Sequence, residues 1–113
     1  MIEVDYPVLG SAIRSLNYKQ LLNFYCVFNY FQNKCNNLCK KEGWEEFNNL
    51  LPILSKKLSN KEISYKEFRS LFSSSIEKMV FSYQIDKVVM LVRESYNYKN
   101  INDLLKVSVK IFN

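Results

Sequence analysis

The sequence predicts an all-α fold, a single small bundle of four to five helices over residues 1–113. Hydrophobic residues make up 48% and aromatic residues 15% of the chain, which is enough apolar surface for one core. Only two Gly and two Pro are present, whereas all-β domains place a turn signal about every 8–12 residues. Apolar residues instead recur at helical spacing behind helix-capping patterns.

Residues 1–16 are expected to form an entry segment. Pro7 and Gly10 interrupt it, and Val8, Leu9, Ile13 and Leu16 fit a short helical turn that packs inward. We therefore predict no full helix before residue 17. The sequence also predicts no second domain and no long linker.

The first helix is predicted to begin after Asn17. Asn17 can cap the free backbone N–H groups, and Gln20 stands where it can bond back to the cap. The apolar pattern then continues toward Lys40 and Lys41, and Gly43 is a natural stop.

The second and third helices follow from similar signals. One opens at Trp44, with a kink or a restart expected at Pro52 because proline lacks a backbone donor. The next begins with the capping box Ser64-Tyr65-Lys66-Glu67. Its Ser73-Ser74-Ser75 run is expected to be a thin helical face that a neighbour approaches closely, with a loop as the alternative.

A fourth helix is predicted from Ile85 to Tyr96, and the pattern near residues 82–84 either breaks or runs straight through. A last helix has Asn100 as its cap. Residues 107–111 alternate between polar and apolar, which leaves a strand as the alternative there. Its expected buried residues are Ile101, Leu104, Leu105, Val107, Ile111 and Phe112.

The chemistry available to the chain argues against an enzyme. There is no histidine, which removes the commonest general base and metal ligand. No glycine-rich phosphate loop is present, so we expect no nucleotide cofactor and no small-molecule substrate. Cys26, Cys35 and Cys39 fall short of the four ligands of a structural zinc site. We interpret them as small core or boundary residues in a reduced compartment and predict no metal.

Basic residues are the best functional signal. The net charge is +5, and residues 6–41 contain five basic and no acidic residues. Such groups can follow a phosphate backbone, and exposed tyrosines among Tyr18, Tyr30, Tyr96 and Tyr98 can stack on bases. The alternative is that the lysines only solvate the surface. The candidate phosphate contacts are Lys34, Lys40, Lys41, Lys56, Lys57, Lys61, Arg69 and Arg93.

Two further expectations concern location and partners. The N-terminus carries Glu3 and Asp5 and no basic run, and long apolar stretches are interrupted, so we expect a cytoplasmic protein with no secretory signal and no membrane span. The aromatic residues of the first helix, from Phe24 to Phe31, are either all core or partly a subunit interface.

Two segments resemble the small helical subunit of CRISPR effector complexes. They are Tyr6-Pro7-Val8-Leu9-Gly10 before a long aromatic helix, and Ser64-Tyr65-Lys66-Glu67-Phe68-Arg69-Ser70-Leu71-Phe72. The resemblance implies a protein of antiviral defence that stacks with copies of itself beside a guide–target duplex.

The sequence thus favours a non-catalytic assembly subunit of a nucleoprotein complex. Its partners would be other protein subunits, copies of itself among the candidates, and the backbone of RNA or single-stranded DNA. The alternative is a phage or viral inhibitor that binds and occludes a host protein.

Overall fold

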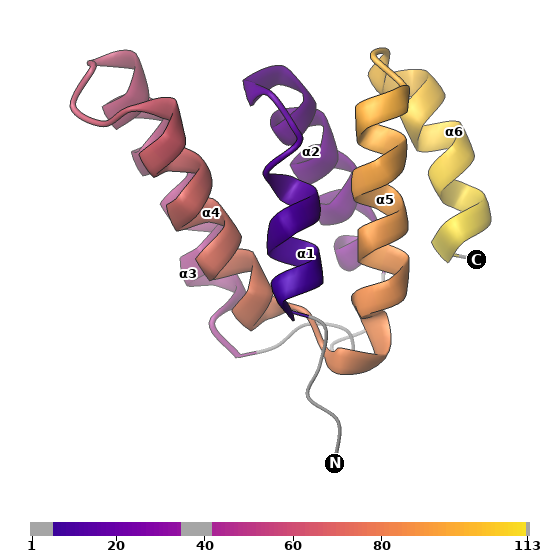
Figure 1. The fold of residues 1–113 in the computed structure, drawn as a ribbon. Coiled ribbons are helices and arrows are strands. Elements are labelled where there is room, and N and C mark those ends of the chain that lie inside the picture. The colour runs from indigo at the N-terminus through magenta and orange to yellow at the C-terminus, as the bar shows by residue number, and fades with distance from the viewer. Residues whose placement is uncertain (1–5, 35–41, 113) are drawn as a thin grey trace.

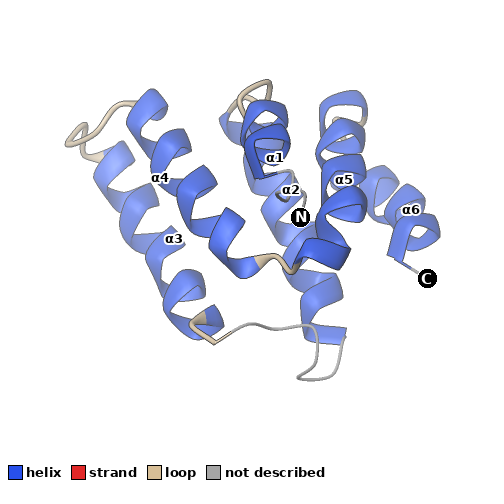
Figure 2. Ribbon diagram, turned by 60° about the horizontal axis from the view of Figure 1, so that its bottom comes forward, coloured by secondary structure: helices blue, strands red, loops and turns tan. Residues whose placement is uncertain are grey.

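A computed structural model describes residues 6–34 and 42–112, and all regular structure in these ranges is helical (Figures 1 and 2). The predicted all-α class is confirmed, but these two ranges contain six α-helices where four to five were predicted. They are α1 (Tyr6–Ile13), α2 (Tyr18–Lys34), α3 (Trp44–Ser59), α4 (Tyr65–Met79), α5 (Ile85–Asn97) and α6 (Ile101–Phe112), with a short 3-10 helix, η2 (Ser82–Gln84), before α5.

The helices form two layers. In Figure 1, α4, α1 and α5 lie side by side toward the viewer, and α3, α2 and α6 lie behind them. Helix α1 packs between α4 and α5, α3 packs on α4, and α2 packs on α5 and α6. The connections 14–17, 60–64 and 98–100 therefore all lie at the same end of the molecule, the upper end in Figure 1. We call this the loop end.

The additional helix is α1, in the segment predicted to be a mere entry. Pro7 is compatible with it because the first helical turn needs no N–H from that residue. The inward packing was predicted correctly, since Leu9, Ile13 and Leu16 are 0–1% exposed. Burial of Leu9 and Ile13 on α1, and of Leu16 shortly after it, anchors α1 in the core.

Helix α2 begins as predicted. The backbone N–H of Gln20 donates to Asn17 Oδ1 at 2.9 Å, and that of Asn17 donates to Gln20 Oε1 at 2.9 Å, which completes a capping box. Phe24 and Phe28 are buried, whereas Tyr30 is 43% exposed. The predicted continuation to Lys40 and Lys41 lies outside the described residues.

Helix α3 corrects one prediction and narrows another, the kink or restart expected at Pro52, to the kink. Gly43 adopts φ +93° and is the N-cap of α3, so a residue predicted to stop one helix starts the next. The helix also continues through Pro52 without a restart. Buried Phe47, Leu51 and Leu54 lie on both sides of the proline, and their packing outweighs its local cost of about 3 kcal/mol.

The later helices follow their capping signals. The capping box of Ser64 and Glu67 is present at the start of α4, and the serine run is helical as predicted. The pattern breaks at η2 before α5 begins. The strand alternative for residues 107–111 is wrong, because they belong to α6. Ile101 was expected to be buried but is 39% exposed.

Candidate nucleic-acid interface

The predicted phosphate contacts lie at different places in the fold. Lys56 and Lys57 stand in the last turns of α3 and Lys61 in the turn that follows, all at the loop end. Lys34 is at the far end of α2, with its Nζ 5.1 Å from the centre of the Tyr30 ring. Arg69 is on α4 and Arg93 on α5. Lys40 and Lys41 lie outside the described residues.

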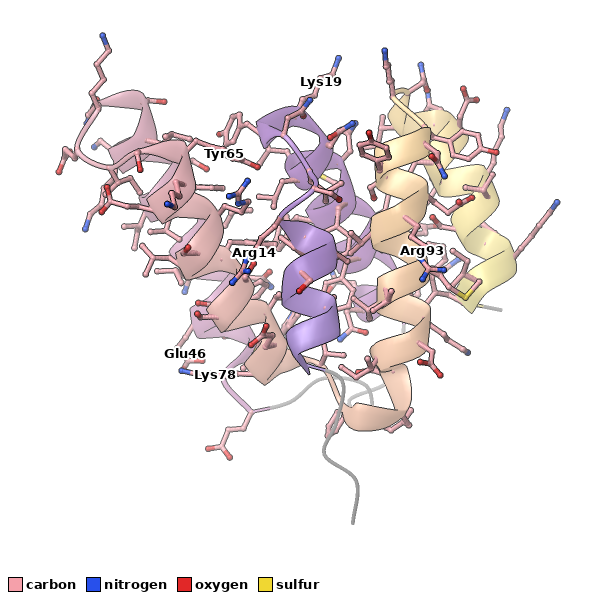
Figure 3. All side chains as sticks on the ribbon, viewed as in Figure 1. Arg14, Lys19, Glu46, Tyr65, Lys78 and Arg93 are labelled. Carbon is pink, nitrogen blue, oxygen red and sulfur yellow. The ribbon has the colours of Figure 1, made fainter. Side chains whose placement is uncertain are left out.

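Positive charge gathers at the loop end. The segments that form it, 14–19, 56–69 and 93–103, contain nine basic and four acidic residues. The remaining described residues contain five of each. In Figure 3, Lys19 stands at the loop end, whereas Glu46 and Lys78 stand toward the opposite end. The net charge of the described chain is therefore concentrated at one end of the bundle.

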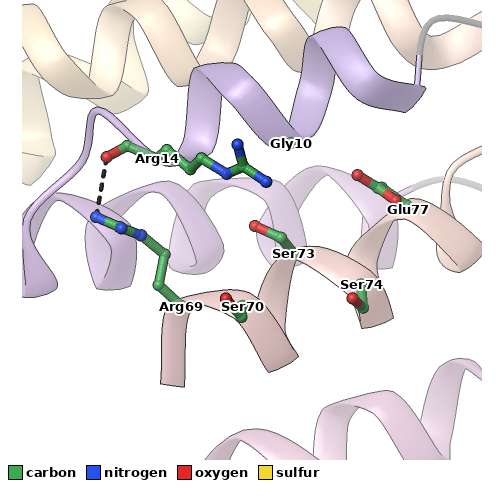
Figure 4. Close-up of a pocket in the computed structure, with 7 residues that line it drawn as sticks. All are labelled: Gly10, Arg14, Arg69, Ser70, Ser73, Ser74 and Glu77. Carbon is green, nitrogen blue, oxygen red and sulfur yellow. Dashed lines mark hydrogen bonds between the residues drawn. The ribbon is translucent and has the colours of Figure 1, made fainter. Parts of the chain in front are cut away.

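A polar cleft lies between α1 and α4, on the front layer (Figure 4). Its volume is about 210 Å³. Two guanidinium groups and three hydroxyl groups line it together with one carboxylate. The lining residues are Gly10, Arg14, Arg69, Ser70, Ser73, Ser74 and Glu77. We call this space the arginine cleft.

Arg69 is held in place from two sides. Its Nη1 donates a hydrogen bond of 3.0 Å to the carbonyl oxygen of Arg14, and its guanidinium lies 5.5 Å from the centre of the Tyr65 ring. Tyr65 is itself fixed, because its hydroxyl donates to the carbonyl oxygen of Leu16 at 2.7 Å. Burial raises the pKa of Tyr65, and the nearby Arg69 charge lowers it in part. The phenol therefore remains a neutral donor beside a positioned cation.

Arg14 reaches the cleft from the C-terminal end of α1. Its backbone N–H donates to the Gly10 carbonyl oxygen at 3.2 Å, which extends the helical turn by one residue. In Figure 4 its guanidinium and the Ser73 hydroxyl point toward one another. The Ser73 Oγ is buried and has no hydrogen-bond partner among the described residues. The cleft thus contains a hydroxyl with unused hydrogen-bonding capacity next to a cation.

Glu77 lies at the other end of the cleft from Arg69 (Figure 4). A Cβ added at Gly10 would be 2.7 Å from Glu77 Oε1. Because Gly10 has no side chain, the Glu77 carboxylate has space to lie against α1. The two ends of the cleft therefore differ in charge, and the arginine end is the part suited to an anion.

A second cleft lies on the other side of α1, between α1 and α5. Its volume is about 340 Å³, and its lining residues are Ala12, Ser15, Val92, Arg93, Tyr96 and Asn97. Figure 3 shows Arg14 and Arg93 on the same face of the molecule. All three arginines of the chain therefore stand on the layer formed by α4, α1 and α5.

Of the three cysteines, the structure describes Cys26. Cys26 is exposed on α2, and partial burial raises the pKa of its thiol, which disfavours the reactive thiolate. Cys35 and Cys39 lie outside the described residues. Within the described part, no cluster of three or more His, Cys, Asp or Glu residues is placed to hold a metal ion.

Arg69 and Arg93 are among the phosphate contacts predicted from the sequence, whereas Arg14 and Ser73, which faces it, are not. The sequence signal for this site is the pair of small residues Gly10 and Ser73, which permit α1 and α4 to approach closely. Chemically, two guanidinium groups and the unpartnered Ser73 hydroxyl are suited to an oxyanion.

No known family, curated protein or solved structure matches this chain. Among the described helices, none has the length and apolar character that a membrane crossing requires.

Proposed function

We propose that this protein is a non-catalytic, cytoplasmic helical module that binds the backbone of RNA or single-stranded DNA through the α4–α1–α5 face, as a subunit of a larger assembly. One observation carries the proposal. Arg69 on α4, Arg93 on α5 and Arg14 directly after α1 are the three arginines of the chain, and they stand on one layer of the fold. Lysines, in contrast, occur at both ends of the molecule.

The chemistry of arginine supports a phosphate ligand. A guanidinium group presents donors in a planar fork that matches two phosphate oxygens, and its charge does not titrate. Arg69 is held by the Arg14 carbonyl oxygen and the Tyr65 ring, so little conformational entropy is lost when it binds. The excess of basic residues at the loop end adds long-range attraction for a polyanion.

The role as a subunit has separate support. The resemblance to the small subunits of CRISPR effector complexes suggests stacking beside a guide–target duplex. Large apolar side chains also remain exposed on the described surface, among them Ile53 at 53%, Leu71 at 47% and Met90 at 47%. Such side chains are suited to protein contacts.

The test is fluorescence anisotropy with labelled single-stranded DNA and RNA of about 12 nucleotides at about 50 mM salt. The test variant is R14Q/R69Q/R93Q. The matched control is K34Q/K78Q/K87Q, which removes the same charge at described positions away from the loop end. We expect the arginine variant to lose at least about tenfold in affinity and the lysine variant to lose about twofold. Equal losses would show that only net charge matters and would contradict the proposed interface.

A second candidate function is occlusion of a host protein, as an inhibitor. Ile53 and Leu71 favour it, because they lie exposed on the adjacent helices α3 and α4. The same titration separates the two functions. If neither strand binds the native protein at about 50 mM salt, the nucleic-acid function is wrong and the inhibitor becomes the better account.

A further inference from the structure

The cleft between α1 and α5 differs in character from the arginine cleft. Val92, on its floor, is 1% exposed, and Ala12 is half-buried. The Tyr96 ring at its edge is 56% exposed, and within the described residues it contacts no other aromatic ring. The cleft therefore combines an apolar floor with an uncovered aromatic face.

Polar atoms surround that apolar floor. The Asn97 side chain can both donate and accept hydrogen bonds, and Arg93 supplies a cation. The Ser15 hydroxyl donates to the Ala12 carbonyl oxygen at 2.6 Å, so its lone pairs remain available as acceptors. The backbone around Tyr96 is anchored, because its carbonyl oxygen accepts a 3.4 Å hydrogen bond from the Gln20 side chain.

This combination matches the chemistry of a nucleobase, which has flat apolar faces and an edge of donors and acceptors. Proteins bind unpaired bases by stacking them on aromatic rings and by hydrogen bonds to their edges. The volume of about 340 Å³ leaves room for a planar heterocycle. Bases inside a duplex are paired and stacked on their neighbours, so they cannot enter such a cleft.

The two clefts lie on opposite sides of α1 and come near one another at its C-terminal end. Arg14 lines one and Ser15, the next residue, lines the other. A strand whose phosphate lies at Arg14 and Arg69 therefore passes directly beside the α1–α5 cleft. This adjacency connects a backbone site to a base site within one stretch of nucleic acid.

We propose that the cleft between α1 and α5 binds one unpaired nucleobase, stacked on Tyr96, while the arginine cleft holds a neighbouring phosphate. The inference rests on the proposed function and deepens it, because it specifies a single strand and assigns a role to Tyr96. The protein then distinguishes single strands from duplexes without reading sequence.

The experiment compares two labelled single strands of equal length, one with normal bases and one with abasic sites throughout. Both carry the same phosphates. We expect the native protein to bind the normal strand about 5- to 150-fold more tightly, the range for stacking of one base. Tyr96→Leu should lose this preference while its affinity for the abasic strand stays unchanged, and Tyr96→Phe should keep it. Tyr83→Leu is the matched control. Tyr83 is 67% exposed and lies in η2, directly before α5, at the end of the molecule opposite the loop end.

The outcomes separate the two proposals. Equal affinity for the normal and abasic strands would overturn the base site and leave backbone binding intact. A loss in Tyr96→Leu that is the same for both strands would also overturn it, because a general structural effect would then explain the change. Binding of neither strand would overturn the base site together with the proposed function.

Discussion

Lys61 is the non-glycine residue of the described chain with a left-handed backbone, at φ +62°. It follows Asn60, the C-cap of α3. The N–H of Lys61 donates to the Leu58 carbonyl oxygen at 3.1 Å, and that of Glu62 donates to the Lys57 carbonyl oxygen at 2.9 Å. These two bonds form a Schellman motif, whose left-handed position is usually occupied by glycine.

Replacing Lys61 by glycine should therefore stabilise the protein. A side chain with a Cβ costs about 1–2 kcal/mol in the left-handed region. Glycine restores about 0.5–1 kcal/mol of conformational freedom to the unfolded chain. The net gain is about 0.5–1 kcal/mol in the free energy of unfolding. For a chain of 113 residues this corresponds to a rise in melting temperature of about 2–4 °C.

Urea unfolding and calorimetry of native, Lys61→Gly and Lys61→Ala proteins would measure the effect. The alanine variant removes the same charge but keeps a Cβ in the left-handed position, so its stability should stay within about 0.5 kcal/mol of the native value. The reasoning is refuted if Lys61→Gly is no more stable than Lys61→Ala, because relief of backbone strain would then not be the cause.

Three further changes test the packing. Ser64→Ala removes the acceptor for the Glu67 N–H and should lower the free energy of unfolding by about 1 kcal/mol in urea titrations; no loss would contradict the capping role. Phe72→Ala opens a cavity among three aromatic rings, those of Phe24, Tyr25 and Phe47, and should cost about 3–5 kcal/mol, measured in the same way. Tyr65→Phe loses the hydrogen bond to the Leu16 carbonyl oxygen and should cost about 1 kcal/mol at neutral pH.

Tyr65 also makes stability depend on pH. Its folded-state pKa is raised by burial, so the folded state holds the phenolic proton more tightly than the unfolded state does. This contribution is fully present below a pH of about 10, the unfolded pKa, and is lost as pH rises through the folded pKa. The stability difference between native protein and Tyr65→Phe should therefore shrink at alkaline pH. A difference that stays constant from pH 7 to about pH 11 would contradict the raised pKa.

The sequence predicted helices best where capping side chains mark their starts. Asn17 and Ser64 with their partners placed α2 and α4 correctly. Helix α1 was missed because Pro7 and Gly10 resemble loop residues when their tertiary contacts are unknown. Of the kink or restart expected at Pro52, the restart does not occur, because burial of the neighbouring apolar residues keeps α3 continuous.

The candidate site was harder to predict because it joins segments distant in the sequence. Arg14 and Arg69 are separated by 55 positions, and the hydrogen bond between them depends on α1 packing against α4 rather than on any local pattern. The sequence suggested Arg69 through charge alone and favoured lysines such as Lys34, which the structure places away from the arginines. The basic residues predicted a phosphate ligand from the sequence, whereas helix packing determines which cations share a face.

Salt dependence of single-strand binding tests the central claim most directly. Each phosphate neutralised contributes a slope of about −0.7 to the logarithm of the affinity plotted against the logarithm of salt concentration. The account predicts that R14Q/R69Q/R93Q has a slope about 2 units shallower than the native protein, while K34Q/K78Q/K87Q keeps the native slope. An unchanged slope in the arginine variant would contradict the claim that these three side chains contact phosphate.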